Sequence, residues 1–392
     1  MRLADSQGAA DIRAELAAWL DEQAPPSLRA VEPPLSSGQV PDWARDWQRT
    51  LFDAGWLVPR WPSGLGGRRA GPVEHLVCLE EMSRRQVPRS LNPQGLDVCA
   101  PVLVEHGTDE QRERWALPTL RGEMTWCLAV REEDLPPNGA AVTSAFAVDE
   151  RDGELVVSGS QPAPPGAQHA DACLCAARIA HGGGSRTGEA AVLVVDLRSP
   201  GVVRPLRPDL TDPRHDPDEL IFDDVAVEPG AVIGPANGGG VAEAARAHER
   251  SARWITRLLD ARRAIEALVV TGHARGLTHD PVFRDSVAAL RVDADGARAL
   301  AYRAFAKEAS GRPAPEVAML PLLAQELSER VYRAGAEALG GDGLDLGLDG
   351  PFPGPGGAWP LQWLTALAES AAVSRPAEHD RVAARVLGLQ AT

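Results

Sequence analysis

The chain has 392 residues, of which 44% are hydrophobic and 24% charged, a composition typical of a soluble globular protein with about two or three domains. The formal net charge of −15 argues against non-specific nucleic-acid binding, which needs a basic surface. No apolar run reaches the roughly 18 residues of a membrane span, and the N-terminus lacks an apolar signal-peptide core, so we expect a cytoplasmic protein.

Residues 1–119 are predicted to form a helical domain. Apolar residues recur at helical spacing over 11–23, and two prolines end this helix. A second helix, over 41–55, begins at a proline and ends at a glycine, which is the usual asymmetry of helix ends. Third and fourth helices are predicted over 72–86 and over part of 96–105.

Residues 120–231 consist of short segments with strand-like composition. Turn dipeptides such as Asp152-Gly153 separate these segments, so the pattern predicts a small antiparallel β-domain or barrel. One segment contains Cys173 and Cys175, which are too close in sequence for a usual zinc site and have no histidine cluster beside them. We interpret them as buried structural thiols.

Residues 232–392 return to long helical patterns. These patterns predict an antiparallel four-helix bundle. Its helices are expected over 239–276, 281–310, 315–340 and 366–389, the last interrupted at Pro376. The connection over 341–357 contains several aspartates but lacks the closing glutamate of a calcium loop, so no metal site is expected.

Several sequence phrases, in this helical–β–helical order, resemble the acyl-CoA dehydrogenase family from about residue 10 to residue 390. They are LFDAGWLVPRWPSGLGG, EHGTDEQRERWALPTLRGEMTWCLAV and IFDDVAVEPGAVIGPANGGG. The resemblance implies an N-terminal helical domain, a central antiparallel β-domain and a C-terminal four-helix bundle. It also implies an oxidoreductase that acts on an acyl thioester with FAD.

Two flavin-binding motifs of that family, both in the β-domain, are altered here. In the loop after Trp126 and Cys127, only Glu132 keeps its place, and Arg131 replaces a hydroxyl donor. In the segment over 159–165, the family's flavin-packing tryptophan becomes Ala163, and two prolines follow it. Because proline has no backbone N–H and no hydroxyl, this segment loses hydrogen-bond donors to the flavin.

Two further flavin motifs, both in the C-terminal helices, are also altered. The resemblance assigns Gly340, Gly341 and Gly343 to the dinucleotide end of the cofactor, but Glu337 replaces a neutral amide there. The glycine pair equally fits a helix C-terminal stop. Near the C-terminus, the family's Gly-Thr motif is lost. We therefore expect no FAD on this chain alone, and FAD only if a partner completes the site.

A candidate catalytic base remains on the first helix of the predicted bundle. Family members place this carboxylate at one of two positions, which correspond to Ser374 and Glu249, and only the second is acidic here. Glu249 is therefore the candidate base, the alternative being that it lies on a solvated helix face.

Three arginines near Glu249, at helical spacing, are the candidate substrate-binding residues. They are Arg246, Arg250 and Arg253. The resemblance implies that Arg250 lines the acyl-CoA channel, and a guanidinium suits a phosphate or a thioester oxygen. His248 lies off this stripe and is interpreted as an ordinary helix histidine.

Three functional interpretations follow. The first is the flavin-deficient subunit of a mixed oligomer, acting on acyl-CoA or an acyl carrier protein thioester beside an intact acyl-CoA dehydrogenase-like chain. The second is a flavin-independent dehydratase, isomerase or cyclase on the same scaffold. The third is a non-catalytic binding module. A homo-oligomer is the alternative assembly, because the family packs its C-terminal helices between subunits.

Overall fold

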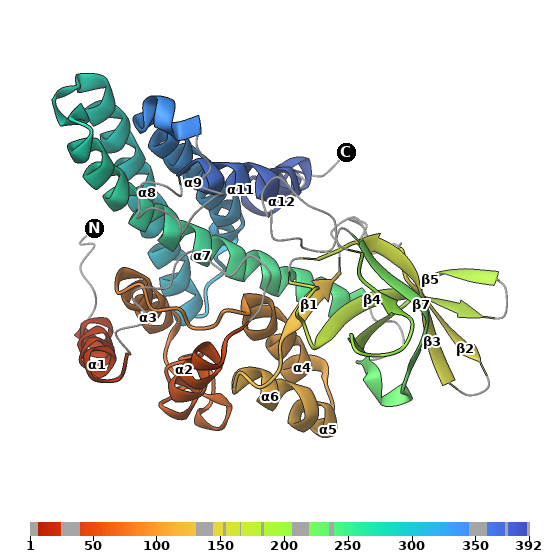
Figure 1. Cartoon of the computed structure of the whole chain (residues 1–392). Coiled ribbons are helices and arrows are strands. Elements are labelled where there is room, and N and C mark those ends of the chain that lie inside the picture. Colours follow the sequence, from red (N-terminus) through yellow and green to blue (C-terminus); the bar gives the residue numbers. More distant parts are fainter. Residues whose placement is uncertain are drawn as a thin grey trace.

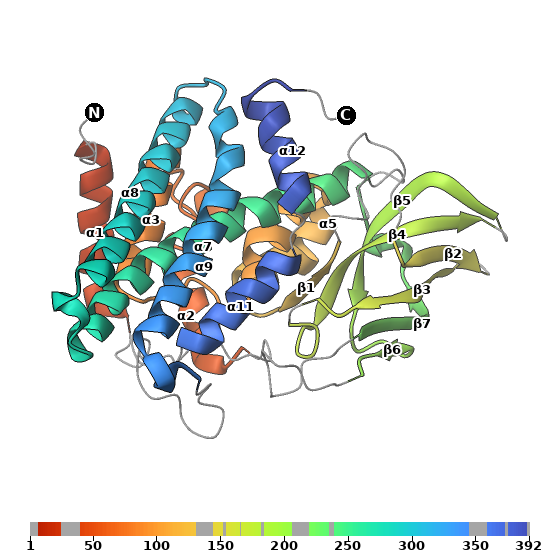
Figure 2. The same cartoon turned by 90° about the horizontal axis from the view of Figure 1, so that it is seen from above.

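The structure is a computed structural model that describes residues 7–24, 40–130, 144–151, 154–164, 166–181, 184–205, 219–234, 239–344, 359–372 and 375–389. Helices from both ends of the chain lie together on one side, and the β-sheet lies on the other (Figures 1 and 2). The predicted fold, with helical, β and helical parts in that order, is confirmed. The exact division at residues 119 and 231 stays a prediction.

The N-terminal part is helical through residue 120. Its helices are α1 (Gln7–Gln23), α2 (Asp42–Asp53), α3 (Pro72–Arg84), the π-helix η3 (Gly95–Cys99), α4 (Ala100–His106), α5 (Asp109–Gln111), the π-helix η4 (Arg112–Ala116) and α6 (Leu117–Leu120). Large apolar side chains fill the centre of this part, among them the fully buried Trp56 and Leu51. Burial of such side chains supplies the main stabilisation.

A buried carboxylate joins this part to the C-terminal helices. Glu80 of α3 accepts hydrogen bonds from Arg13 of α1 at 3.1 Å, and from Arg298 and Tyr302 of α8 (Pro281–Ala309) at 2.6 and 2.9 Å. Burial raises the pKa of Glu80, but the hydrogen bonds from Arg298, Arg13 and Tyr302 outweigh it and hold that pKa below its usual value. The ionised carboxylate therefore links α1, α3 and α8.

The central part is one eight-stranded sheet. Its strands are β1 (Trp126–Ala129), β2 (Ala147–Arg151), β3 (Glu154–Pro162), β4 (Ala172–His181), β5 (Gly184–Asp196), β6 (Val202–Val203), β7 (Glu219–Val227) and β8 (Val232–Ile233). Their order is β6-β7-β3-β2-β4-β5-β8, with β1 also paired to β4. Most neighbours are antiparallel, as predicted, but β1 and β2 both run parallel to β4.

The cysteines of the sheet are buried thiols. Cys173 and Cys175 lie on β4, and Cys127 of β1 lies opposite Cys173. Burial raises the pKa of Cys173 well above its usual value, so its thiol stays protonated. Within the described ranges, no group of three or more histidine, cysteine or acidic residues is arranged to hold a metal. The burial of both thiols agrees with the structural interpretation of the Cys-x-Cys pair.

The C-terminal part contains α7 (Gly239–Ala274), α8, α9 (Leu320–Ala338), α11 (Trp359–Ala372) and α12 (Arg375–Val386). The predicted fourth helix is thus two helices, and it begins seven residues earlier than expected, at Trp359 rather than 366. The indole of Trp359 is buried against α9, where a Cβ on Gly335 would lie 2.1 Å from it. Pro376 lies in the first turn of α12, where a missing N–H costs no helical hydrogen bond.

Helix α7 is the element that connects the bundle to the sheet (Figures 1 and 2). Its first turns bury Val241, Ala242 and Ala245 in the core of the β-domain, whereas Trp254 and Leu258 belong to the core of the bundle. Among the described residues, none of the helices is both long and apolar enough to cross a membrane.

Candidate functional site

The candidate site lies where α7 leaves the β-domain. Arg246, in the second turn of α7, is buried, and its Nη1 donates to the carbonyl oxygen of Val130 at 3.2 Å. Val130 directly follows β1, so this arginine holds α7 against the end of that strand. Of the three arginines predicted to bind substrate, Arg246 thus has one hydrogen bond to the protein's own backbone, and its contact with substrate stays a prediction.

The other predicted residues of this segment are placed only by their backbone. Glu249, Arg250 and Arg253 lie in α7, and their side chains lie outside the described part of the structure. Position 249 is three residues, less than one helical turn, after Arg246. The candidate base is therefore on the part of α7 that borders the β-domain, and its role stays a prediction.

His248 makes a contact that the sequence did not predict. Its Nε2 lies 3.1 Å from Oε2 of Glu105 in α4. The same oxygen lies 3.9 Å from Nε2 of His106. The carboxylate of Glu105 therefore has two imidazole rings near it, one from α4 and one from α7.

Two side chains of the N-terminal part hold the first strand of the sheet in place. Asn92 accepts from the N–H of Trp126 at 2.9 Å through Oδ1 and donates to the carbonyl of Trp126 at 2.8 Å through Nδ2. Gln94 accepts from the N–H of Leu128 at 3.0 Å. These ties fix the strand that leads to the family's flavin loop. Sequence reasoning missed them, and the Asn-Pro turn signal before the helix is the only hint of them.

The π-helix η3 continues from this contact and packs beside β1. Oδ1 of Asn92 also accepts from the N–H of Gly95 at 3.1 Å. A Cβ at Gly95 would lie 2.3 Å from that oxygen and 2.9 Å from the indole of Trp126, so only glycine fits. Single-turn π-helices frequently occur at functional sites, which agrees with the position of η3 beside the candidate site.

The altered segment over 159–165, at the end of β3, contains prolines that offer no backbone donor. Ala163 packs against the β-domain core, and Pro164 is buried, with its carbonyl oxygen accepting from the N–H of Ala167 at 3.1 Å. Arg204 donates to the carbonyls of Ala167 and Gln168 at 2.9 and 3.0 Å. Oε1 of the buried Gln161 has no donor among the described residues. The backbone carbonyls of Pro164, Ala167 and Gln168 therefore have partners within the protein, whereas the side chain of Gln161 lacks one among the described residues.

The glycines predicted for the dinucleotide end lie directly after α9. Gly340 has φ of +60°, a left-handed conformation, two residues beyond the last residue of the helix. This agrees with the alternative that the pair ends the helix. Gly341 and Gly343 follow in the 3₁₀ helix η9 (Gly340–Leu344), where Asp342 is paired with Arg275 at 2.7 Å. Their cofactor role stays a prediction.

Two family positions named above lie outside the described residues, and His379 is exposed on α12. Glu132 and Ser374 belong to segments that the structure does not describe. His379 is exposed on α12, whereas its neighbour Glu378 is buried and paired with Arg381 at 2.7 Å. Nothing in these contacts brings His379 to α7.

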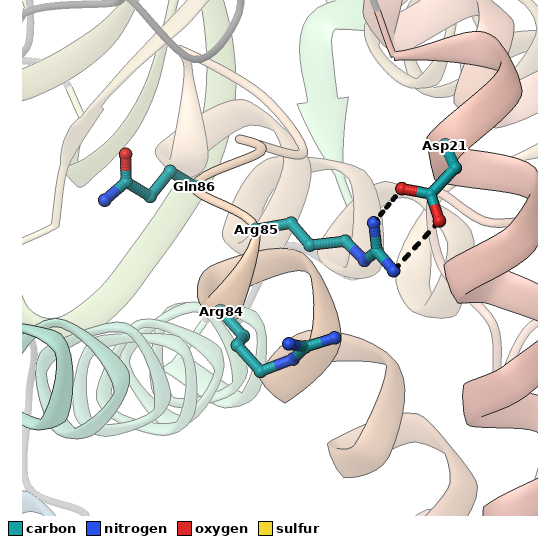
Figure 3. A pocket seen from close by; sticks show the side chains of 4 residues that line it. All are labelled: Asp21, Arg84, Arg85 and Gln86. Atoms are coloured by element: carbon teal, nitrogen blue, oxygen red, sulfur yellow. Dashed lines mark hydrogen bonds and ion pairs between the residues drawn. The ribbon is translucent and has the colours of Figure 1, made fainter.

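A surface hollow of about 370 Å³ lies elsewhere, between α1 and the end of α3, lined by Asp21, Arg84, Arg85 and Gln86 (Figure 3). Arg85 forms two hydrogen bonds to Asp21, and both arginines also pair with the buried Glu81. Since acidic partners already balance both arginines, the hollow does not form an anion site, and we do not assign it a function.

Comparison with known proteins identifies the family. Residues 6–123 match the model of the acyl-CoA dehydrogenase N-terminal domain, and residues 236–369 match that of the acyl-CoA dehydrogenase C-terminal domain. The chain belongs to the acyl-CoA dehydrogenase family. The predicted resemblance is thereby confirmed.

Two relatives illustrate how far this chain has diverged within the family. Acyl-CoA dehydrogenase IpdE1 of Mycolicibacterium smegmatis is 27% identical over 70% of this chain and 73% of its own length. Acyl-CoA dehydrogenase FadE34 of Mycobacterium tuberculosis is 34% identical over 52% of this chain, but the match spans only 28% of FadE34.

Solved structures of two-chain assemblies share the fold. The Tcur3481-Tcur3483 steroid ACAD matches all of this chain and all of its own with a TM-score of 0.78 and 20% identity. A chain of the ChsE4-ChsE5 complex from Mycobacterium tuberculosis is matched over its whole length by the whole of this chain, with a TM-score of 0.74 and 19% identity. At this identity the likeness concerns the fold alone.

Proposed function

We propose that this chain is the flavin-deficient subunit of a mixed oligomer that acts on an acyl thioester. The observation that carries the proposal is the donor-poor segment at the end of β3, where Pro162 and Pro164 flank Ala163. In these three residues only Ala163 has a backbone N–H, and its side chain offers a methyl group where an aromatic ring would pack. These residues do not fit a flavin held by this chain alone, since a flavin needs several donors.

Electrostatics at the end of α9 supports the same proposal. Glu337 and Asp342 are both exposed there, with side-chain exposures of 71% and 72%. Asp342 is paired with Arg275, but the ion pair of Glu337 with Arg333 is long, at 3.8 Å. A carboxylate beside a pyrophosphate would repel it, so this end of the chain is poorly suited to the dinucleotide part of FAD.

Exposed apolar side chains on the bundle support an oligomer. Three valines, Val270 of α7 and Val282 and Val292 of α8, are each between 66% and 74% exposed. Two names among the structural neighbours, Tcur3481-Tcur3483 and ChsE4-ChsE5, each designate two chains, which is the arrangement proposed here. Sedimentation as a strict monomer at micromolar concentration, alone and with the flavin-containing chain, would contradict this part.

The chemistry left to this chain is removal of the α-proton of the thioester. Glu249 is the candidate base, because an ionised carboxylate beside an acyl cavity can accept that proton. Arg250 and Arg253 are proposed to bind the thioester oxygen or a phosphate of the carrier. Arg246 is proposed to keep this segment of α7 against the β-domain, through its contact with Val130.

Exchange of α-protons into D₂O tests the base without requiring flavin. Phenylacetyl-CoA is a suitable probe, because its ring and its thioester both acidify the α-carbon. Glu249→Gln keeps the shape of the side chain and should lower the exchange rate by about 10²–10⁴-fold. Full exchange by this variant would refute the assignment. Exchange by wild type, combined with no flavin in any complex, would favour the flavin-independent alternative.

A further inference from the structure

The first turns of α7 are held from two sides. Arg246 contacts the carbonyl of Val130 at 3.2 Å, and His248 contacts Glu105 at 3.1 Å. Successive helix residues are rotated by about 100°, so positions 246 and 248 are about 200° apart around the axis. The two contacts therefore lie on nearly opposite sides of the helix, and α7 cannot rotate about its axis without losing one of them.

The surroundings of Glu105 favour its contact with His248. Its Oε2 also lies 3.9 Å from Nε2 of His106, and a Cβ on Gly234 would lie 3.9 Å from the Cβ of His106. The carboxylate of Glu105 thus lies where three segments meet, namely α4, α7 and Gly234, which follows β8. An imidazole N–H donates to a carboxylate or to an amide oxygen in either protonation state of the ring.

We infer that Glu105 and His248 form a positioning pair, which fixes the rotation of α7 at the neighbouring position 249. This inference rests on the proposed function of Glu249. Neither residue of the pair is required to touch the substrate. Glu105 is half exposed, and exposed ion pairs contribute little energy, so loss of the pair should lower turnover by about three- to fivefold.

Three variants of the full chain test the pair through hydrogen exchange. Glu105→Ala should raise deuterium uptake in the peptide that spans residues 243–252. Glu105→Gln, whose amide oxygen still accepts from His248, should restore the wild-type uptake. Glu123→Ala is the matched control, because it breaks another exposed ion pair, to Arg49 at 2.6 Å. Equal uptake in Glu105→Ala and wild type would overturn the inference, whatever the activity.

A double-mutant cycle with phenylacetyl-CoA separates this inference from the proposed function. Glu105→Ala should lower kcat for α-proton exchange by about three- to fivefold at unchanged KM, and should have no further effect in the Glu249→Gln background. If Glu249→Gln alone exchanges normally, the proposed base is wrong. If Glu249→Gln is impaired but Glu105→Ala leaves wild-type kcat unchanged, or lowers it equally in both backgrounds, the pair does not act through position 249.

Discussion

The carboxylate of Glu80 in α3 and the altered segment around Ala163 differ in how completely their polar groups are partnered within the chain. Glu80 accepts hydrogen bonds from α1 and α8 and so joins the N-terminal and C-terminal parts of the fold. From Pro162 to Pro164 the altered segment has no hydroxyl or aromatic side chain, and the carbonyl oxygen of Pro164 accepts from the N–H of Ala167. The contacts of Glu80, which join the N-terminal and C-terminal helices, are therefore separate from the segment proposed to have lost its contacts with the cofactor.

The largest expected effect in this comparison is the loss of Glu80. The side chain is 11% exposed, and Glu80→Ala leaves the guanidinium of Arg298, which is 19% exposed, without this partner. Breaking a buried ion pair on one side costs about 3–5 kcal/mol. We expect the free energy of unfolding to fall by about 3 kcal/mol in urea denaturation. A change below about 1 kcal/mol would show that this contact does not hold the parts together.

A smaller effect is expected at the tie between the N-terminal part and β1. Asn92→Ala removes three hydrogen bonds, two of them to the backbone of Trp126. Leaving such groups unpaired should cost about 2 kcal/mol. Thermal unfolding of the variant measures this cost, with Asn92→Asp, which keeps the acceptor oxygen, as the control of intermediate stability. Identical melting of both variants and wild type would contradict the role of Asn92.

The Glu80 contact should also weaken in acid. Hydrogen bonds hold the pKa of Glu80 below its value in the unfolded chain, so its stabilisation is complete above the unfolded pKa and is lost as the pH falls through the folded one. The stability difference between wild type and Glu80→Gln should therefore shrink from neutral pH towards pH of about 3. Urea denaturation at both pH values checks this, and a difference that grows in acid would contradict the assigned sign.

The smallest effect is expected from Glu337 at the end of α9, another position that we propose to be unsuited to the cofactor. Glu337 is exposed, and its ion pair with Arg333 is long, at 3.8 Å. Glu337→Gln should therefore change the free energy of unfolding by less than about 0.5 kcal/mol. Urea denaturation beside Glu80→Gln gives the comparison directly, since both variants make the same chemical change. Equal destabilisation by the two variants would remove the distinction between the contact that joins the helical parts and the positions proposed to face the cofactor.

The sequence predicted the elements better than their contacts. Helical spacing and terminal proline and glycine residues were sufficient for the helices over 72–86 and 281–310. The parallel pairing of β1 and β2 with β4 was not predicted, because strand order depends on contacts between distant segments. For the same reason, the contact of His248 with Glu105, which joins residues 143 positions apart, has no local signal.

The candidate site was predictable only in its positions. The glutamate at 249 could be aligned with a family base, but the environment of its side chain depends on how α7, α4 and β1 meet. Arg246 shows the difference, since its helical spacing indicated a substrate contact, whereas its contact with the carbonyl oxygen of Val130 had no signal in the sequence. Spacing on a helix reveals which residues share a face, but not what that face contacts.

The measurement that tests the central claim most directly is the FAD content of the purified chain, alone and after co-expression with an intact acyl-CoA dehydrogenase-like chain. We predict no stoichiometric FAD and no flavin absorbance for the chain alone, and FAD in the complex with its partner. A yellow protein that contains FAD in a 1:1 ratio when purified alone would show that backbone contacts suffice to bind the cofactor, and would contradict the proposed loss of flavin binding.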